Sequence, residues 1–173
     1  PVVNDAAPTT PAIWWYNGTA LLLKKADLLI AIKKYHLALD ILEQASIFDN
    51  TDLNLYILKT EAYLALDMQE QAAEILESAL ERFEGEEKIE LLFELADVYD
   101  DFENFDKVFD CLSAVLELEP TNEEALYKIC FWTDFTGRNE ESIKLHKKII
   151  SIGNIFPIKI YTFRFLFPII QPY

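Results

Sequence analysis

The chain has 173 residues, of which 51% are hydrophobic and 26% charged, a composition typical of a globular protein. The 30 acidic residues outnumber the 15 basic ones and give a net charge of −15, which repels phosphate backbones and anionic lipid surfaces. Nucleic acid and membrane surfaces are therefore disfavoured as partners. All acidic residues lie at or before Glu141, so the charge is concentrated in the part of the chain that precedes the C-terminal segment.

The two ends of the sequence differ from the region between them. Residues 1–18 are predicted to form a leader and an N-terminal cap, with a partial preceding helix as the alternative for residues 13–16. They do not resemble an intact secretory signal, and two cysteines are too few to staple a chain of this size. We therefore expect a cytoplasmic protein, with a signal peptide already removed as the alternative.

Between the ends the sequence repeats with spacings of 34, 36 and 34 residues. Small residues recur in two columns, and large apolar residues recur four residues before the first column and four residues after the second. The small-residue columns read Ala26, Thr60, Ala96, Cys130 and Ala38, Ala72, Val108, Ser142.

Each repeat contains two stretches with helical spacing of apolar residues, separated by a short polar turn. In the third repeat the spacing predicts helices over about 87–101 and about 105–117, the second ending before Pro120.

This pattern resembles the tetratricopeptide repeat. The third repeat carries the family's signature most fully, at Leu92, Leu95, Ala96, Tyr99, Val108, Leu112, Val115 and Pro120. Lys25 and Lys59 depart from it, since they stand where Leu95 carries the family's leucine. The resemblance implies an all-α, right-handed superhelix of antiparallel helix pairs, with units 19–52, 53–88, 89–122 and 123–152.

The resemblance also implies that the first helix of each pair lines a concave groove. Outward positions of these helices are acidic and aromatic, which predicts a partner protein or peptide with basic and apolar residues. The predicted groove residues are Leu23, Asp27, Ile57, Glu61, Phe93, Asp97, Asp100, Asp101, Tyr127, Phe131, Asp134 and Phe135. For Phe131 and Phe135, a cap over the last unit is an equal alternative. The same acidic residues disfavour the family's co-chaperone function, which uses basic residues to bind a C-terminal carboxylate.

The sequence offers little for catalysis. It has no glycine-rich phosphate loop and no zinc-binding motif, so we predict a non-catalytic scaffold without cofactor or metal. One alternative is a thiol enzyme that uses Cys130 with His146, although a buried cysteine beside a histidine accounts for the same pair. A second is a carboxylate site formed by Asp97, Asp100, Asp101 and Asp134, for which a solvated acidic face is the simpler interpretation. A third is a purely structural segment of a longer array.

Residues 153–173 do not continue the repeat. They are apolar and aromatic, with Lys159 and Arg164 as their only charges, and prolines and charges interrupt them too often for a membrane span. We favour a cap on the last unit. One alternative is insertion into a groove, either of the same molecule or of a neighbouring molecule; the second case would make the protein a homo-oligomer. Another alternative is a non-native end of a truncated array.

Overall fold

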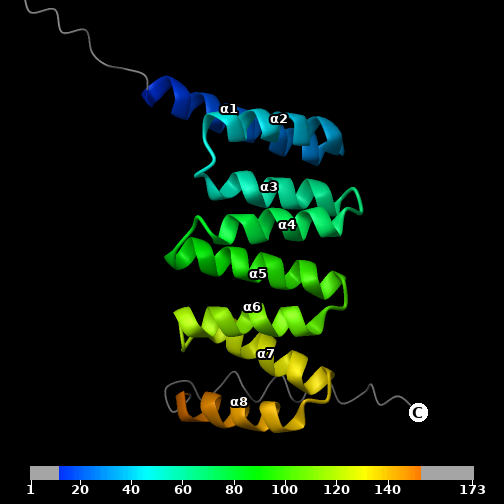
Figure 1. Cartoon of the computed structure of the whole chain (residues 1–173), viewed down its shortest axis with the longest axis vertical. Helices are drawn as coiled ribbons and strands as arrows, with labels where there is room; N and C mark the ends of the chain where they lie inside the picture. The colour runs from blue at the N-terminus through cyan, green and yellow to red at the C-terminus, as the bar shows by residue number, and fades with distance from the viewer. Residues whose placement is uncertain (1–11, 153–173) are drawn as a thin grey trace, which may run out of the picture. The chain divides into compact units, whose positions relative to one another are not determined.

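The structure, a computed structural model, describes residues 12–152, and every regular element in that range is an α-helix. Figure 1 shows them joined by short connections. The chain divides into two compact units, Pro1–Cys111 and Leu112–Tyr173. The helices are α1 (Ala12–Ala31), α2 (Tyr35–Phe48), α3 (Leu53–Leu64), α4 (Gln69–Leu80), α5 (Gly85–Asp101), α6 (Phe105–Leu118), α7 (Glu123–Phe135) and α8 (Asn139–Ile152).

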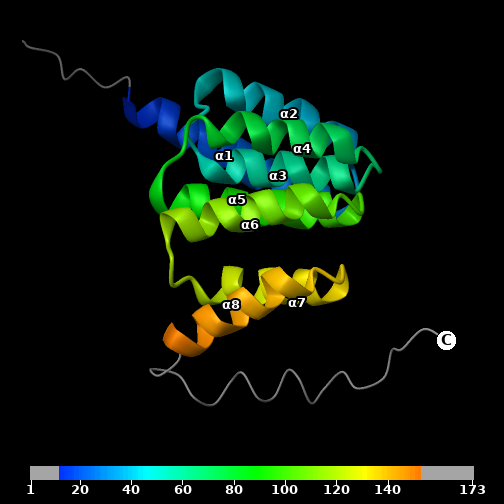
Figure 2. The same ribbon diagram turned by 60° about the horizontal axis from the view of Figure 1, so that its bottom comes forward.

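In the first unit, helices α1 to α5 stack in chain order. Each packs against the next, and α3 additionally contacts both α1 and α5 (Figures 1 and 2). The first helices of successive pairs are therefore neighbours, so that corresponding positions of α1, α3 and α5 follow one another along the stack. In the second unit, α7 packs against α8.

The small-residue columns explain why the paired helices approach closely. Where the structure describes their side chains, the members of both columns are buried, as a close helix contact requires. The large apolar residues four positions after the second column, Leu42, Leu76 and Leu112, are buried as well and have no exposed surface. The buried members of the small-residue columns are Ala26, Thr60, Ala96, Cys130, Ala38, Ala72 and Val108.

The turn inside each helix pair has one conformation that recurs at the period of the sequence. A residue with positive φ follows the first helix of every pair, at spacings of 34, 36 and 34 residues. The next residue then donates its backbone N–H to a carbonyl five residues earlier, for example from Asn104 to Tyr99 (2.9 Å) and from Arg138 to Thr133 (2.9 Å). The positive-φ residues are Lys33, Asp67, Glu103 and Gly137.

Helix boundaries agree with the sequence prediction within a few residues, with one clear exception. The two helices predicted in the third repeat are found as α5 and α6. Helix α1, however, begins at Ala12, so residues 12–18, which the sequence analysis places in the leader and N-terminal cap, belong to the first helix and not to a separate preceding one. The predictions for residues 1–11 and 153–173 concern segments outside the described residues.

A buried lysine is the least expected part of the first unit's core. Lys59 of α3 is buried, and its ammonium group donates a hydrogen bond to Glu43 Oε2 of α2 at 3.0 Å. The ion pair lies where α2 packs on α3 and compensates the charge that the side chain carries into the core.

No helix of the described region is long and apolar enough to cross a membrane.

Candidate interaction surfaces

The first unit carries an acidic column along its first helices. Asp27 of α1, Glu61 of α3 and Asp97 of α5 occupy corresponding positions, and all three are exposed. Four residues before Glu61 and Asp97 lie Ile57 and Phe93, which are half-buried. Because α3 contacts both α1 and α5, these residues form a surface on which apolar side chains adjoin carboxylates.

Leu23 does not belong to this surface. It is buried, and it lies on the face of α1 that carries the buried residues Ala26 and Ile30. Leu23 is therefore not a groove residue: its helical spacing matches Ile57 and Phe93, but its side chain packs into the core.

The carboxylates at the end of α5 differ in exposure. Asp97 and Asp101 are exposed, whereas Asp100 is half-buried. Asp134, which the carboxylate alternative joined to them, lies on α7 in the second unit. Within residues 12–152, no group of three His, Cys, Asp or Glu side chains is placed to hold a metal ion.

In the second unit, α7 exposes a row of aromatic side chains at intervals of four residues. Tyr127, Phe131 and Phe135 lie on one helix face, and Phe131 and Phe135 are 41% and 66% exposed. Their rings are stacked, with centroids 6.2 Å apart. Trp132 meets both rings edge-on, at 5.0 Å and 5.5 Å. The exposed carboxylate of Asp134 lies on the same helix, so this surface is also aromatic and acidic.

Trp132 is the member of this ring cluster that the sequence analysis missed. Its position corresponds to Val98 of α5, which is buried in the helix stack, so its register predicts a core residue. The signal that could have found it is local: Trp132 lies three residues before Phe135, a spacing that places two side chains within reach on a helix.

A polar cluster connects α4, α5 and the start of α6 within the first unit. The Tyr99 hydroxyl donates a hydrogen bond to Glu77 Oε1, and Lys107 Nζ lies 2.7 Å from that hydroxyl and 3.1 Å from the same carboxylate oxygen. Lys107 Nζ also lies 4.4 Å from the centre of the Tyr99 ring. The hydrogen bond from Tyr99 lowers the pKa of Glu77, and burial raises the pKa of Tyr99. The cluster fastens three helices together.

The cysteine and the histidine of the thiol-enzyme alternative both lie in the second unit. Cys130 is buried on α7, and His146 is half-buried on α8. Burial, together with the charge of Asp134, raises the pKa of Cys130 to about 11, so the thiol is protonated near neutral pH. An activated cysteine needs the opposite environment, since it is the thiolate that attacks.

Comparisons with known proteins identify the fold. No family model and no curated protein matches the sequence. Among solved structures, the chain is similar to MamA, with 19% identity over 90% of this chain and 80% of MamA, at a TM-score of 0.62. A second MamA structure is 21% identical over 78% of each chain, also at 0.62. The chain is also similar to YrrB, described as a TPR protein with an unusual peptide-binding site, with 19% identity, 75% and 66% of the two chains covered, and a TM-score of 0.56.

The chain therefore has the tetratricopeptide-repeat fold, and the predicted fold class and resemblance are confirmed. At these identities the likeness concerns the fold, so the function has to be argued from the surfaces.

Proposed function

We propose that the protein is a non-catalytic interaction scaffold that binds a protein segment carrying basic and apolar residues. The observation that carries the proposal is the row formed by Tyr127, Phe131 and Phe135 on α7. Large aromatic side chains rarely stay exposed together unless they bind something, because apolar area gains free energy when it leaves water. The carboxylate of Asp134 supplies a charge that orients a lysine or arginine of the partner.

The first unit supports the same chemistry independently. Its column of Asp27, Glu61 and Asp97 is exposed beside Ile57 and Phe93. A partner with alternating basic and apolar residues can therefore be bound by either unit through the same two kinds of contact. YrrB, which shares the fold, is described as having a peptide-binding site, which supports a binding function in general.

The proposal is tested with a pair of peptides that differ only in charge. One carries lysines between aromatic residues, and the other has each lysine replaced by glutamate; binding is measured by fluorescence anisotropy at about 50 mM and about 500 mM salt. We expect the lysine peptide to bind and to weaken at high salt, because exposed charges are screened within about 10 Å at 0.1 M. Equal binding of both peptides, or no binding of either, would contradict the proposal.

Two variants locate the site. Phe131→Ala removes an aromatic contact of the surface and should weaken binding of the lysine peptide about tenfold or more, as loss of a well-packed aromatic anchor does. Ile143→Ala is the matched control, since Ile143 is an exposed apolar residue of α8 in the same unit. If both substitutions weaken binding equally, the α7 row is not the site.

A further inference from the structure

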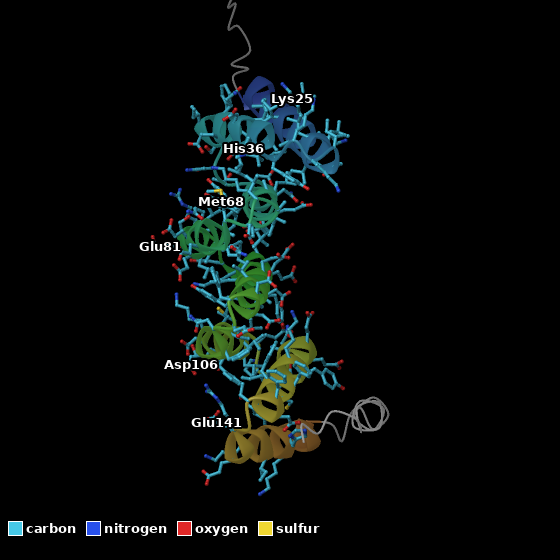
Figure 3. The ribbon with its side chains drawn as sticks, turned by 90° about the vertical axis from the view of Figure 1, so that its right-hand side faces the viewer. Lys25, His36, Met68, Glu81, Asp106 and Glu141 are labelled. Atoms are coloured by element: carbon cyan, nitrogen blue, oxygen red, sulfur yellow. The ribbon has the colours of Figure 1, made fainter. Side chains whose placement is uncertain are left out.

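An apolar stripe on α1 lies on the opposite side of the helix from its buried face. Leu21, Leu28 and Ile32 are 70%, 67% and 59% exposed, and Lys25 lies between them on the same face. Figure 3 labels Lys25 on α1, the helix at one end of the first unit's stack. This stripe is separate from the acidic column and has the opposite charge.

The repeat register shows what such a stripe does elsewhere in the unit. The positions of Leu21, Lys25 and Leu28 correspond to three buried positions of α3 and to three buried positions of α5. Those faces lie in helices that pack against the second helix of the preceding pair, α2 on α3 and α4 on α5. The buried residues are Leu55, Lys59 and Ala62 in α3, and Leu91, Leu95 and Val98 in α5. The stripe on α1 thus corresponds to the face that is covered by the preceding helix in α3 and in α5.

The lysine in the stripe specifies the charge of the helix that fits. In α3, the corresponding Lys59 binds Glu43 of α2 at 3.0 Å. Lys25 has no ion-pair partner among the described residues, and Lys24 adds a second positive charge next to it. A helix with an apolar face and a carboxylate in the place of Glu43 would complete at α1 the contact that α2 makes with α3.

We propose that this stripe is a docking site for an acidic amphipathic helix of a partner protein, which packs on α1 as α2 packs on α3. Neither flanking segment of the sequence matches such a helix, since residues 1–11 contain three prolines and residues 153–173 contain no Asp or Glu. A second copy stacking its last helix on α1 would place Lys147, the counterpart of Glu43, against Lys25. The inference goes beyond the proposed function, because it concerns another surface and a partner of opposite charge.

The probe for this site is a synthetic peptide with the sequence of residues 34–49, which contains α2 and its flanking residues. Binding to the full chain is measured by fluorescence anisotropy, with circular dichroism to follow helix formation in the peptide. We expect the peptide to bind and to become helical. In the full-length protein, Leu28→Asp should weaken binding of the peptide at least tenfold. Ile47→Asp in the protein, at an exposed apolar position of α2 outside the stripe, should leave binding unchanged.

A charge exchange separates docking on α1 from displacement of the chain's own α2. A peptide with Glu43→Lys should bind several-fold more weakly to the original protein, and Lys25→Glu in the protein should restore its binding. Lys25 is exposed, so the protein variant is expected to fold. If the Lys25→Glu variant does not restore binding, or if Leu28→Asp has no effect, the proposal is overturned.

Two further outcomes are decisive. If light scattering shows that the protein self-associates and that Leu28→Asp makes it monomeric, the occupant is a second copy and the proposal is wrong. The lysine peptide that tests the α7 surface is measured on the same Leu28→Asp variant. Its continued binding together with loss of the helix peptide supports the docking site, whereas loss of both peptides means that Leu28→Asp damages the protein and that the effect does not report docking on α1.

Discussion

Tyr99 links three helices through one hydroxyl group, and its removal has a predictable pH dependence. Tyr99→Phe should lower the free energy of unfolding by about 1 kcal/mol at pH 7, the usual worth of such a hydrogen bond. Because the hydrogen bond lowers the pKa of Glu77 below its ordinary value of 4.5, this contribution is present above that value and is lost as the pH falls through the lowered one. The difference between the two proteins should therefore shrink in acid.

Urea unfolding of the original protein and the Tyr99→Phe variant at pH 7 and in acid measures this difference. Tyr63→Phe is the matched control, since Tyr63 occupies the corresponding position of α3 and its hydroxyl makes no hydrogen bond among the described residues. A Tyr99→Phe effect that is constant over the whole pH range would show that the hydroxyl does not act through Glu77.

Lys59 offers a second test at the scale of one residue. A buried ammonium group recovers from its attraction to one carboxylate about what it loses in hydration, so an apolar residue of similar size is often more stabilising. Lys59→Leu should raise the free energy of unfolding by about 1 kcal/mol, because leucine stands in the corresponding place at Leu95. Glu43→Gln should lower it, since a buried ammonium group loses its partner. Chemical denaturation of both variants decides; a destabilised Lys59→Leu protein would show that the ion pair stabilises the fold.

The two cysteines should be unreactive in the folded protein. Burial, the largest cause, raises the pKa of Cys111 to about 12 and that of Cys130 to about 11, from an ordinary 9.0. At pH 8 the thiolate fraction of Cys130 is then about 100-fold lower than in the unfolded chain. Alkylation by iodoacetamide, followed by mass spectrometry with and without denaturant, should show at least this difference. Rapid labelling of Cys130 in the folded protein would contradict this prediction and support the thiol-enzyme alternative.

At the scale of the helix pair, the recurring turn determines where glycine is favourable. Gly137 has a φ of 71°, a conformation that costs other residues about 1 kcal/mol, so Gly137→Ala should destabilise the protein by about that amount. Glu103→Gly should stabilise the protein by a smaller amount. Glycine removes the strain of the φ of 56° in the folded protein, but it also increases the conformational entropy of the unfolded chain. Gly18→Ala, in the interior of α1, is the control and should be stabilising, since added methyl atoms meet nothing there. Thermal unfolding measures all three.

The repeat made the helix pairs predictable from sequence, because each structural position is sampled four times. Ala26, Thr60 and Ala96 identify the helix contact together, although threonine alone would not. The turns were not predictable in the same way, since the left-handed position holds Lys33 and Glu103 and glycine marks it only in the last pair.

The candidate surfaces were predictable only in part, because helical spacing does not determine which edge of a helix its neighbours cover. Leu23 is buried although its counterparts Ile57 and Phe93 are half-buried. The stripe containing Leu21 and Leu28 went unnoticed because its counterparts in the later repeats are ordinary core residues. Only the structure distinguishes the covered faces from the uncovered one.

At the scale of the whole molecule, the net charge of −15 makes stability depend on salt. Like charges repel within the folded chain, and added ions screen this repulsion. The melting temperature should therefore rise by about 3 °C between about 20 mM and about 300 mM NaCl, as expected for a gain near 1 kcal/mol in a chain of this length. Calorimetry in NaCl and in KCl at equal ionic strength checks that screening is the cause. A melting temperature that falls with salt would mean that attractive ion pairs outweigh the repulsion.

The turn that ends α7 has a consequence for the handedness of the amino acid it accepts. Positive φ is unfavourable for ordinary L-residues but is the preferred region of their mirror images. At residue 137, D-alanine would therefore keep the turn that glycine forms while giving the unfolded chain fewer conformations. A chemically synthesised protein with this one inverted centre should be more stable than the natural one, whereas L-alanine at the same place makes it less stable.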